Sequence, residues 1–148
     1  MTIMDRIKIA LDTHHAGLNC CTSVLTAFAD KTGLTEQQCY GISSGMGGGL
    51  RTGSVCGALI GGVMVLGILF PHDPTTGAAG KAYNAELTKR LQSRFAEKQG
   101  DTLCRVIKPR EAQYQSEAYA QKGAKANCDH YIALSVELVE EIIREEEK

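Results

Sequence analysis

Residues 45–70 constrain the fold of this chain more than any other stretch. A glycine-rich loop leads to Cys56, and from there the sequence is almost wholly apolar, with Gly57, Gly61 and Gly62 replacing bulk on one side. Glycines three and four residues apart in an apolar run are typical of a buried helix that a neighbouring helix approaches closely. Each glycine inside a helix costs roughly 1 kcal/mol relative to alanine, so several together need a packing reason. The stretch therefore predicts a buried central helix.

The rest of the chain also shows helical patterns. Apolar residues recur at helical spacing over residues 3–14, 83–98 and 127–143. Asn19 and the pair Thr35 and Gln38 are N-terminal cap signals for two further helices, and Gly33 and Gly100 are stop signals. Residues 111–121 are polar and only weakly helical, and the Glu/Lys tail after Arg144 predicts a solvated end. With no strand-like alternation, the sequence predicts one all-α domain over residues 1–148, a helical bundle around the glycine-rich helix.

Composition narrows the classes of function. The net charge of −1 and the scarcity of aromatic residues argue against nucleic acid as a partner. The N-terminus has no apolar secretory region, and residues 56–70 are too short for a membrane span of ~20 residues, so no membrane insertion is expected. We therefore expect a cytoplasmic protein. In that reducing compartment, six cysteines indicate redox chemistry or metal binding rather than structural disulfides.

Four of the cysteines share a local pattern, because each follows a cap-forming residue within three positions. The pairs are Asn19 with Cys20, Ser54 with Cys56, Asp101 with Cys104, and Asn127 with Cys128. If these caps are used, all four thiols lie in first helical turns. There the helix dipole can lower a thiol pKa from ~8.5, given nearby positive charge such as Arg51 or Arg105. The alternative is that each cysteine is a small, buried apolar residue.

The same residues carry a family resemblance. The segment Cys56–Gly61, CGALIG, fits the signature CGAxxG, and further cysteines occur in LNCC at 18–21, LCRVI at 103–107 and NCDH at 127–130. In this order the chain resembles the C_GCAxxG_C_C family of small redox-active proteins. The resemblance implies redox activity without naming a reaction or a cofactor. A small residue such as alanine is usual in that family where Cys21 stands, so Cys20, directly after Asn19, is the expected active thiol. Cys39 is expected to be a core or surface residue without a role in the site.

Other candidates have simpler explanations. His14, His15 and His130 can transfer protons or bind metals, but two of them end a helix whose dipole already favours histidine, and His130 should turn away from Cys128. A phosphate-bearing cofactor could bind backbone N–H groups of the loop glycines, but no Walker lysine follows and no strand precedes them. Glycines that let the chain pass close to the cysteines explain the loop better; the four are Gly47, Gly48, Gly49 and Gly53.

These observations predict a thiol-based oxidoreductase acting by thiol–disulfide exchange or electron transfer with an unnamed redox partner. Cys20 and Cys56 are expected to lie within disulfide reach as the working pair, with Cys104 and Cys128 lining the same pocket as resolving thiols. The first alternative is a metal protein in which these four cysteines hold an iron–sulfur cluster or zinc. The second is a non-enzymatic module that binds a partner through its apolar C-terminal helix. The width of that helix's apolar face also predicts a homodimer.

Overall fold

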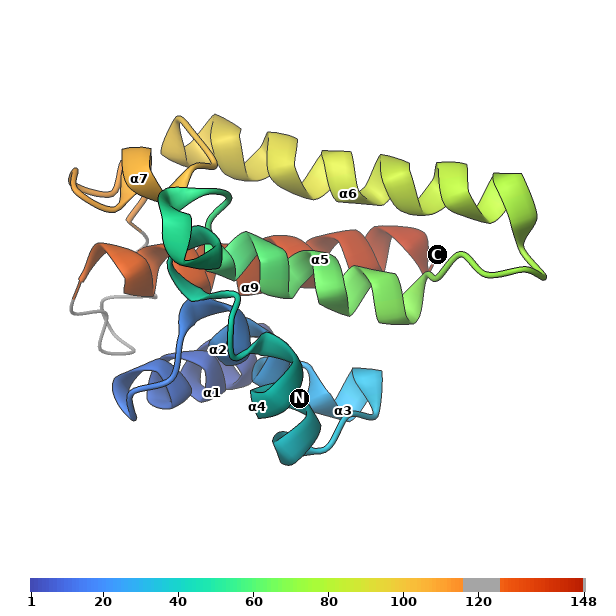
Figure 1. Cartoon of the computed structure of the whole chain (residues 1–148), viewed down its shortest axis with the longest axis horizontal. Helices are drawn as coiled ribbons and strands as arrows, with labels where there is room; N and C mark the ends of the chain where they lie inside the picture. Colours follow the sequence, from blue (N-terminus) through green and yellow to red (C-terminus); the bar gives the residue numbers. More distant parts are fainter. Residues whose placement is uncertain (116–125, 148) are drawn as a thin grey trace.

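The computed structural model describes residues 1–115 and 126–147, which form an all-α single-domain bundle, as predicted (Figure 1). Between Gly49 and Gly53 the chain makes a single π-type turn, η1. Among the described residues, β pairing is limited to an isolated antiparallel bridge between Val55 and Leu103. No helix in the described parts of the chain has the length and apolar character of a membrane span. The helices are α1 (Ile3–His15), α2 (Cys20–Ala27), α3 (Ala29–Thr32), α4 (Glu36–Ser43), α5 (Gly57–Leu69), α6 (Gly77–Gln99), α7 (Cys104–Ile107) and α9 (Asn127–Glu146).

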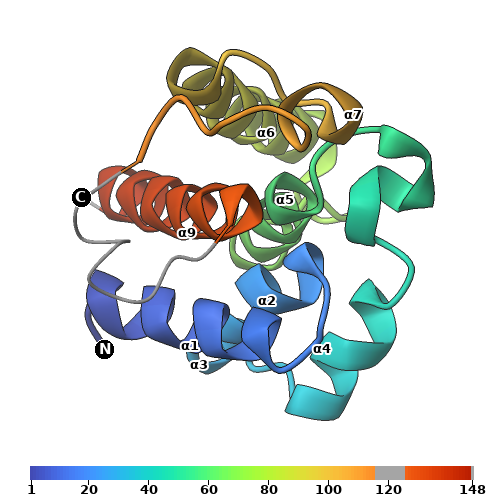
Figure 2. The same cartoon turned by 90° about the vertical axis from the view of Figure 1, so that its left-hand side faces the viewer.

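The helices form three layers. α5 and α9 lie side by side in the middle, α6 covers one side of them, and α1 to α4 cover the other (Figures 1 and 2). Helix α5 contacts α2, α6 and α9, and the side chains that it buries include Leu59, Val65 and Leu66. The prediction of a buried, glycine-rich central helix is confirmed.

Most of the predicted helix ends occur where the cap signals stand. The Asn19 side chain accepts a hydrogen bond from the Thr22 N–H, and Thr35 and Gln38 form a reciprocal capping box. Gly33 and Gly100 adopt the left-handed conformation that ends a helix. The helix expected from Cys20 to Gly33 is interrupted at Phe28, which separates α2 from α3. Residues 111–115 form no helix, and the remainder of the weak helical pattern, 116–121, lies outside the described residues.

Helix α9 is buried within the chain, against α1, α2, α5 and α6. The apolar side chains that suggested an exposed interface, among them Ile132, Val136 and Ile143, are core residues. A centrally placed helix needs an apolar surface on several sides, which explains the width of its apolar face without a second chain. The homodimer and the partner-binding module remain predictions, but the apolar face of α9 no longer supports them.

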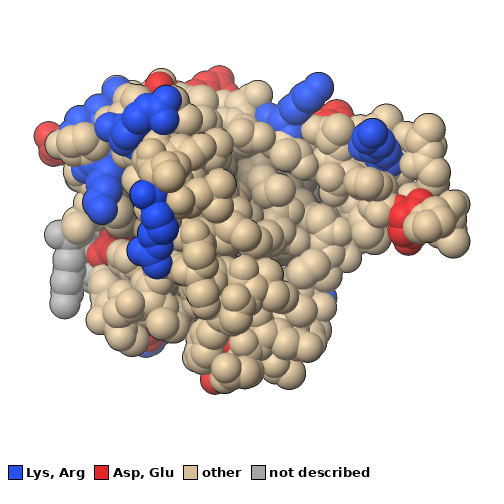
Figure 3. Space-filling model, viewed as in Figure 1, with Lys and Arg blue, Asp and Glu red and all other residues tan. Residues whose placement is uncertain are grey.

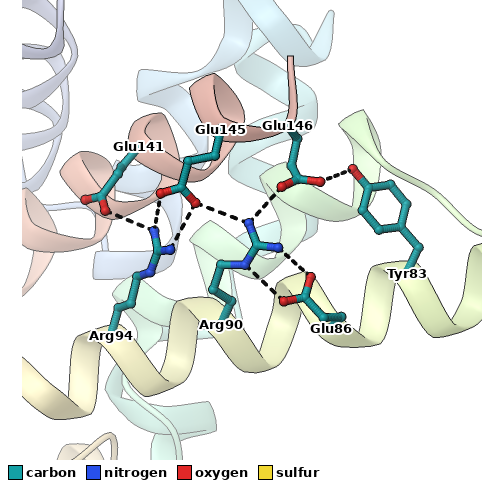
Figure 4. Close-up of polar contacts among 7 residues, drawn as sticks. All are labelled: Tyr83, Glu86, Arg90, Arg94, Glu141, Glu145 and Glu146. Carbon is teal, nitrogen blue, oxygen red and sulfur yellow. Dashed lines mark hydrogen bonds and ion pairs between the residues drawn. The ribbon is translucent and has the colours of Figure 1, made fainter. Parts of the chain in front are cut away.

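The expectation of a solvated C-terminal tail is wrong for Glu145 and Glu146. Lys and Arg side chains occur along α6 in the upper part of the molecule, and a second group gathers around α7 (Figure 3). On α6, Arg94 contacts Glu145 at 2.9 Å and Arg90 contacts Glu146 at 2.8 Å (Figure 4). Glu146 also accepts a hydrogen bond from the Tyr83 hydroxyl. These partly buried ion pairs join the last turn of α9 to α6, and a sequence pattern on one helix cannot reveal them.

Two glycines allow α2 to lie directly against α5. A Cβ atom on Gly57 would lie 3.0 Å from the Met46 carbonyl oxygen and 3.3 Å from Cys20 Cβ. One turn later, a Cβ on Gly61 would lie 2.7 Å from the Cys21 carbonyl oxygen. Real Cβ atoms rarely approach a backbone oxygen so closely, so a larger residue at either position must displace α2. The expected close approach on this face of the helix is confirmed.

Replacing Gly61 by leucine should therefore lower the free energy of unfolding by at least ~1–3 kcal/mol, because it overpacks the contact with α2. The matched control is Gly67→Leu in the same helix, where a Cβ would meet nothing within 4 Å. There the gain in helix propensity should leave stability unchanged or raise it by up to about 1 kcal/mol. Denaturant unfolding of the two variants measures the difference, and equal stabilities would show that the α2–α5 contact is not tight.

Candidate functional site

The four cysteines of the predicted pattern line one pocket, which we call the thiol pocket. It has a volume of about 580 Å³ and lies where the N-terminal ends of α2, α5, α7 and α9 meet, at the left of Figure 1 and towards the viewer in Figure 2. Four segments far apart in the sequence therefore each bring one thiol to the same place. The cysteines are Cys20, Cys56, Cys104 and Cys128, and other lining residues include His14, Tyr40, Arg51, Lys108 and Tyr131.

Three of the four thiols lie in first helical turns. Cys20 and Cys104 are the first residues of α2 and α7, and Cys128 is the second residue of α9. Cys56 differs from the expectation, because it is the N-cap of α5 and the helix begins at Gly57. Ser54 does not cap α5, since its backbone is extended and its carbonyl accepts the Cys104 N–H at 2.7 Å.

A short backbone bridge holds Cys56 beside Cys104. The Cys56 N–H donates to the Thr102 carbonyl at 2.8 Å. This hydrogen bond and the one from the Cys104 N–H to the Ser54 carbonyl lie on either side of the paired residues Val55 and Leu103. Residues on either side of a bridged pair point to the same face. Cys56 and Cys104 are therefore held on one face of the bridge.

The expected caps Asp101 and Asn127 have other roles. Asp101 accepts hydrogen bonds from the N–H groups of Thr102 and Leu103 and so fixes the turn before α7, while Leu103 occupies the N-cap position. Asn127 lies inside α9, and its side chain donates to the Arg110 carbonyl. It thereby ties the start of α9, which carries Cys128, to the segment after α7. Asp101 positions the pocket wall through a local turn, and Asn127 does so through a tertiary contact that local pattern does not show.

The start of α2 is anchored on its other side by Asn19. Besides capping α2, its side-chain N–H group donates to the Ser43 carbonyl at 3.0 Å. A Cβ on Gly47 would lie 2.5 Å from Asn19 Cβ, so a glycine is needed where the loop passes this anchor. The loop thus packs directly against the segment that presents Cys20.

The loop then makes a left-handed turn at the rim of the pocket. Gly48, Gly49, Leu50 and Arg51 have consecutive φ values of 59°, 61°, 58° and 63°. A Cβ on Gly49 would lie 2.4 Å from the Ser54 backbone, and one on Gly53 would lie 2.8 Å from Arg105 Cβ. Close packing explains these glycines, and binding of a cofactor phosphate by the loop remains a prediction.

A family model described as "Putative redox-active protein (C_GCAxxG_C_C)" matches residues 18–142. The match spans all four cysteines of the thiol pocket and well over half of the chain. The chain belongs to the C_GCAxxG_C_C family. No curated protein and no solved structure matches it.

Within this family member, Cys20 and Cys128 lie close enough to shift each other's pKa in opposite directions. The interaction with the Cys20 thiol does most to lower the pKa of Cys128 to about 7, and the charge of Lys108 lowers it further. Burial and the neighbouring carboxylate of Asp129, which contacts His15 at 2.7 Å, act in the opposite direction. The same interaction and burial raise the pKa of Cys20. The interaction therefore favours the thiolate on Cys128 over the thiolate on Cys20.

The expectation of lowered thiol pKa values for Cys20 and Cys56 is wrong. Burial raises the pKa of Cys56 to about 12, against the opposing effect of the Ala58 and Leu59 N–H groups. Burial also raises the pKa of Cys21 to about 12, and that of Cys39. A helix N-terminus favours a thiolate, but removal from water disfavours it by more at these positions.

The remaining candidates occupy less central positions. His14 lines the pocket and contacts the Leu18 carbonyl through Nδ1, whereas His15 contacts Asp129. Among the described residues, no group of three or more His, Cys, Asp or Glu side chains is arranged to hold a metal ion. The residue that the sequence analysis did not single out is Lys108. It stands four positions after Cys104, about one helical turn, and that spacing is a signal that could have identified it.

Because their pKa values differ, the cysteines should react with an alkylating reagent over different pH ranges. Because the thiolate is the nucleophile, the rate at which iodoacetamide modifies Cys128 should rise with pH around a midpoint near 7. In Cys20→Ala, which lacks the neighbouring thiol, the midpoint should move up towards ~8.5 or beyond. Mass spectrometry of individual peptides measures both, and Cys39→Ala is the control. A Cys128 midpoint that Cys20→Ala leaves unchanged would contradict the interaction between the two thiols.

Proposed function

We propose that this protein is a thiol–disulfide oxidoreductase in which Cys128 is the attacking thiolate and Cys20 is the resolving thiol. The observation that carries the proposal is that these two thiols line one pocket and interact, with the pKa lowered on Cys128 and raised on Cys20. A thiol whose pKa lies near ambient pH combines a useful fraction of thiolate with good nucleophilicity. Cys128 is also partly exposed, unlike Cys56.

The reaction follows in two exchanges. The Cys128 thiolate attacks one sulfur of a substrate disulfide, forming a mixed disulfide and releasing the first substrate thiolate, which takes up a proton. Cys20 then loses its proton and attacks the Cys128 sulfur, forming a Cys20–Cys128 disulfide and releasing the second substrate thiolate. Two electrons and the proton of Cys20 pass to the substrate, whose second thiolate is protonated from water according to its own pKa, and an external dithiol restores the pair by the same steps in reverse.

Cys56 and Cys104 can act as a second dithiol. A Cβ on Gly57 would lie 3.3 Å from Cys20 Cβ, so the Cys56 backbone runs close to Cys20. Once deprotonated, Cys56 would attack the Cys20 sulfur and release the Cys128 thiolate. Cys104 would then attack Cys56 and release Cys20, so the disulfide passes to Cys56 and Cys104, and further substrate oxidises Cys20 and Cys128 again. The pair expected from the sequence, Cys20 with Cys56, is the intermediate of this transfer. The reducing cytoplasm, which keeps such thiols free between turnovers, is the compartment that we propose.

The alternative is that the same four thiols bind zinc or an iron–sulfur cluster. What favours it is that Cys20, Cys56, Cys104 and Cys128 all line one pocket. Thiolates would then be ligands, and a bound metal would lower the pKa of every coordinating thiol. Metal analysis of anaerobically purified protein distinguishes the two functions, because exchange requires no stoichiometric metal.

The exchange function predicts where a substrate is trapped. When reduced protein reacts with a small disulfide, wild type should end with an intramolecular Cys20–Cys128 disulfide. Cys20→Ala should instead accumulate a stable mixed disulfide on Cys128, because the resolving thiol is absent. Peptide mapping by mass spectrometry identifies both products, and Cys39→Ala, whose thiol is buried outside the pocket, should behave as wild type.

Two results would contradict this function. One is a mixed disulfide in Cys20→Ala that falls on another cysteine. The other is a stoichiometric metal whose chelation is needed before any of the four thiols reacts.

A further inference from the structure

A second hollow opens beside the thiol pocket, and we call it the basic cleft. Its lining includes three cationic side chains, Arg51, Arg105 and Lys108. It shares Arg51, Lys108 and Cys104 with the thiol pocket, so the two hollows adjoin each other. A molecule that reaches the thiols can therefore extend into the cleft.

The cations of the cleft are not neutralised by ion pairs. Within residues 1–115 and 126–147, no carboxylate forms a salt bridge with any of the three, and all three side chains are exposed. Arg51 donates to the Ser44 carbonyl at 3.2 Å and Arg105 to the Gly53 carbonyl at 3.3 Å. Since a guanidinium has five N–H donors, each arginine keeps donors for a ligand. Figure 3 shows Lys and Arg side chains gathered at this end of the molecule, around α7.

Arginines elsewhere in the chain contrast with this group. Arg6 is buried between Asp30 and Glu140, and Arg90 and Arg94 are each paired with carboxylates of α9 (Figure 4). Asp101, whose pKa is lowered mainly by the N–H groups of Leu103 and Thr102 that its carboxylate accepts, forms no salt bridge with Arg105 among the described residues. The two arginines of the cleft therefore differ from Arg6, Arg90 and Arg94 in having no carboxylate ion-pair partner in the part of the chain that the structure describes.

The backbone that carries Arg51 is strained. Leu50 and Arg51 both have the left-handed conformation, which costs roughly 1–2 kcal/mol per residue when the residue is not glycine. Strained residues of this kind cluster at ligand-binding and active sites. Here the left-handed turn carries Arg51, whose side chain lines both the cleft and the thiol pocket.

We propose that the substrate of the thiol pocket is a small disulfide that carries an anionic group, and that the basic cleft binds this group. The inference rests on the proposed exchange function and adds the class of substrate. Arg51, Arg105 and Lys108 hold the anion, while the disulfide lies against the thiols. Cys104 lines both hollows and is therefore the thiol nearest to the bound anion.

The test uses three disulfides that share one two-carbon frame and differ in charge. They are 3,3′-dithiodipropionate, bis(2-hydroxyethyl) disulfide and cystamine, which are anionic, neutral and cationic. Each is mixed with the reduced protein, and the rate of thiol oxidation is measured at low ionic strength. We expect the anionic compound to react roughly tenfold faster than the neutral one, because a basic cleft raises the local concentration of anions. Cystamine should be the slowest.

The variant Arg51→Gln/Arg105→Gln should lose most of this preference, so that the ratio of anionic to neutral rates falls roughly tenfold towards one. Lys81→Gln, an exposed charge change at the opposite end of α6, is the control and should keep the wild-type ratio. Competition by acetate and by inorganic phosphate at constant ionic strength identifies the charged group. Stronger inhibition by phosphate assigns a phosphate to the substrate, and stronger inhibition by acetate assigns a carboxylate.

Failure of the inference and failure of the function look different. If the double variant and Lys81→Gln give the same ratio as wild type, the basic cleft does not select the substrate, although exchange can still occur. If none of the three disulfides oxidises the thiols, the exchange function fails, and the substrate inference fails with it.

Discussion

The start of α2 lies against the start of α5 because Gly57 and Gly61 have no side chains, and the site depends on this contact. It brings Cys20 next to the backbone of Cys56, at one end of the bundle. The same approach keeps the glycine loop tight against Asn19, so the loop passes along the rim of the pocket. A bulky residue on this face of α5 would first separate Cys20 from Cys56 and only then affect Cys104 and Cys128.

Electrostatics then divides the four thiols into different roles. The N-terminal position of Cys128, its interaction with Cys20 and the nearby Lys108 together outweigh burial and favour a thiolate. Cys56 also lies at a helix N-terminus, yet its burial is nearly complete and its pKa rises. A helix end alone therefore does not activate a thiol in this fold. At Cys128 a neighbouring thiol and a cation, Lys108, act on the same sulfur, whereas burial is the largest effect on Cys56.

The sequence predicted the bundle, its central helix and the four cysteines of the pocket, because these depend on local signals such as helical spacing, caps and glycine positions. It could not predict which thiol is ionised, because that depends on burial and on partners far apart in the chain, such as Cys20 with Cys128. The roles of Asn127 and Ser54 differed for the same reason, since tertiary hydrogen bonds replaced the expected caps. The sequence analysis did not single out Arg6, which is buried among Asp30, Glu140 and Phe28 through contacts far apart in the chain.

The central claim is that the four helix ends assemble one redox centre in which Cys20 and Cys128 exchange a disulfide. A pair of crystal structures, of the reduced protein and of the protein oxidised by a small disulfide, tests it most directly. We expect free sulfurs in the first and a Cys20–Cys128 bond of about 2.05 Å in the second, with the helices in place. An oxidised structure in which these sulfurs stay unbonded, or in which a metal ion bridges all four cysteines, would contradict the account.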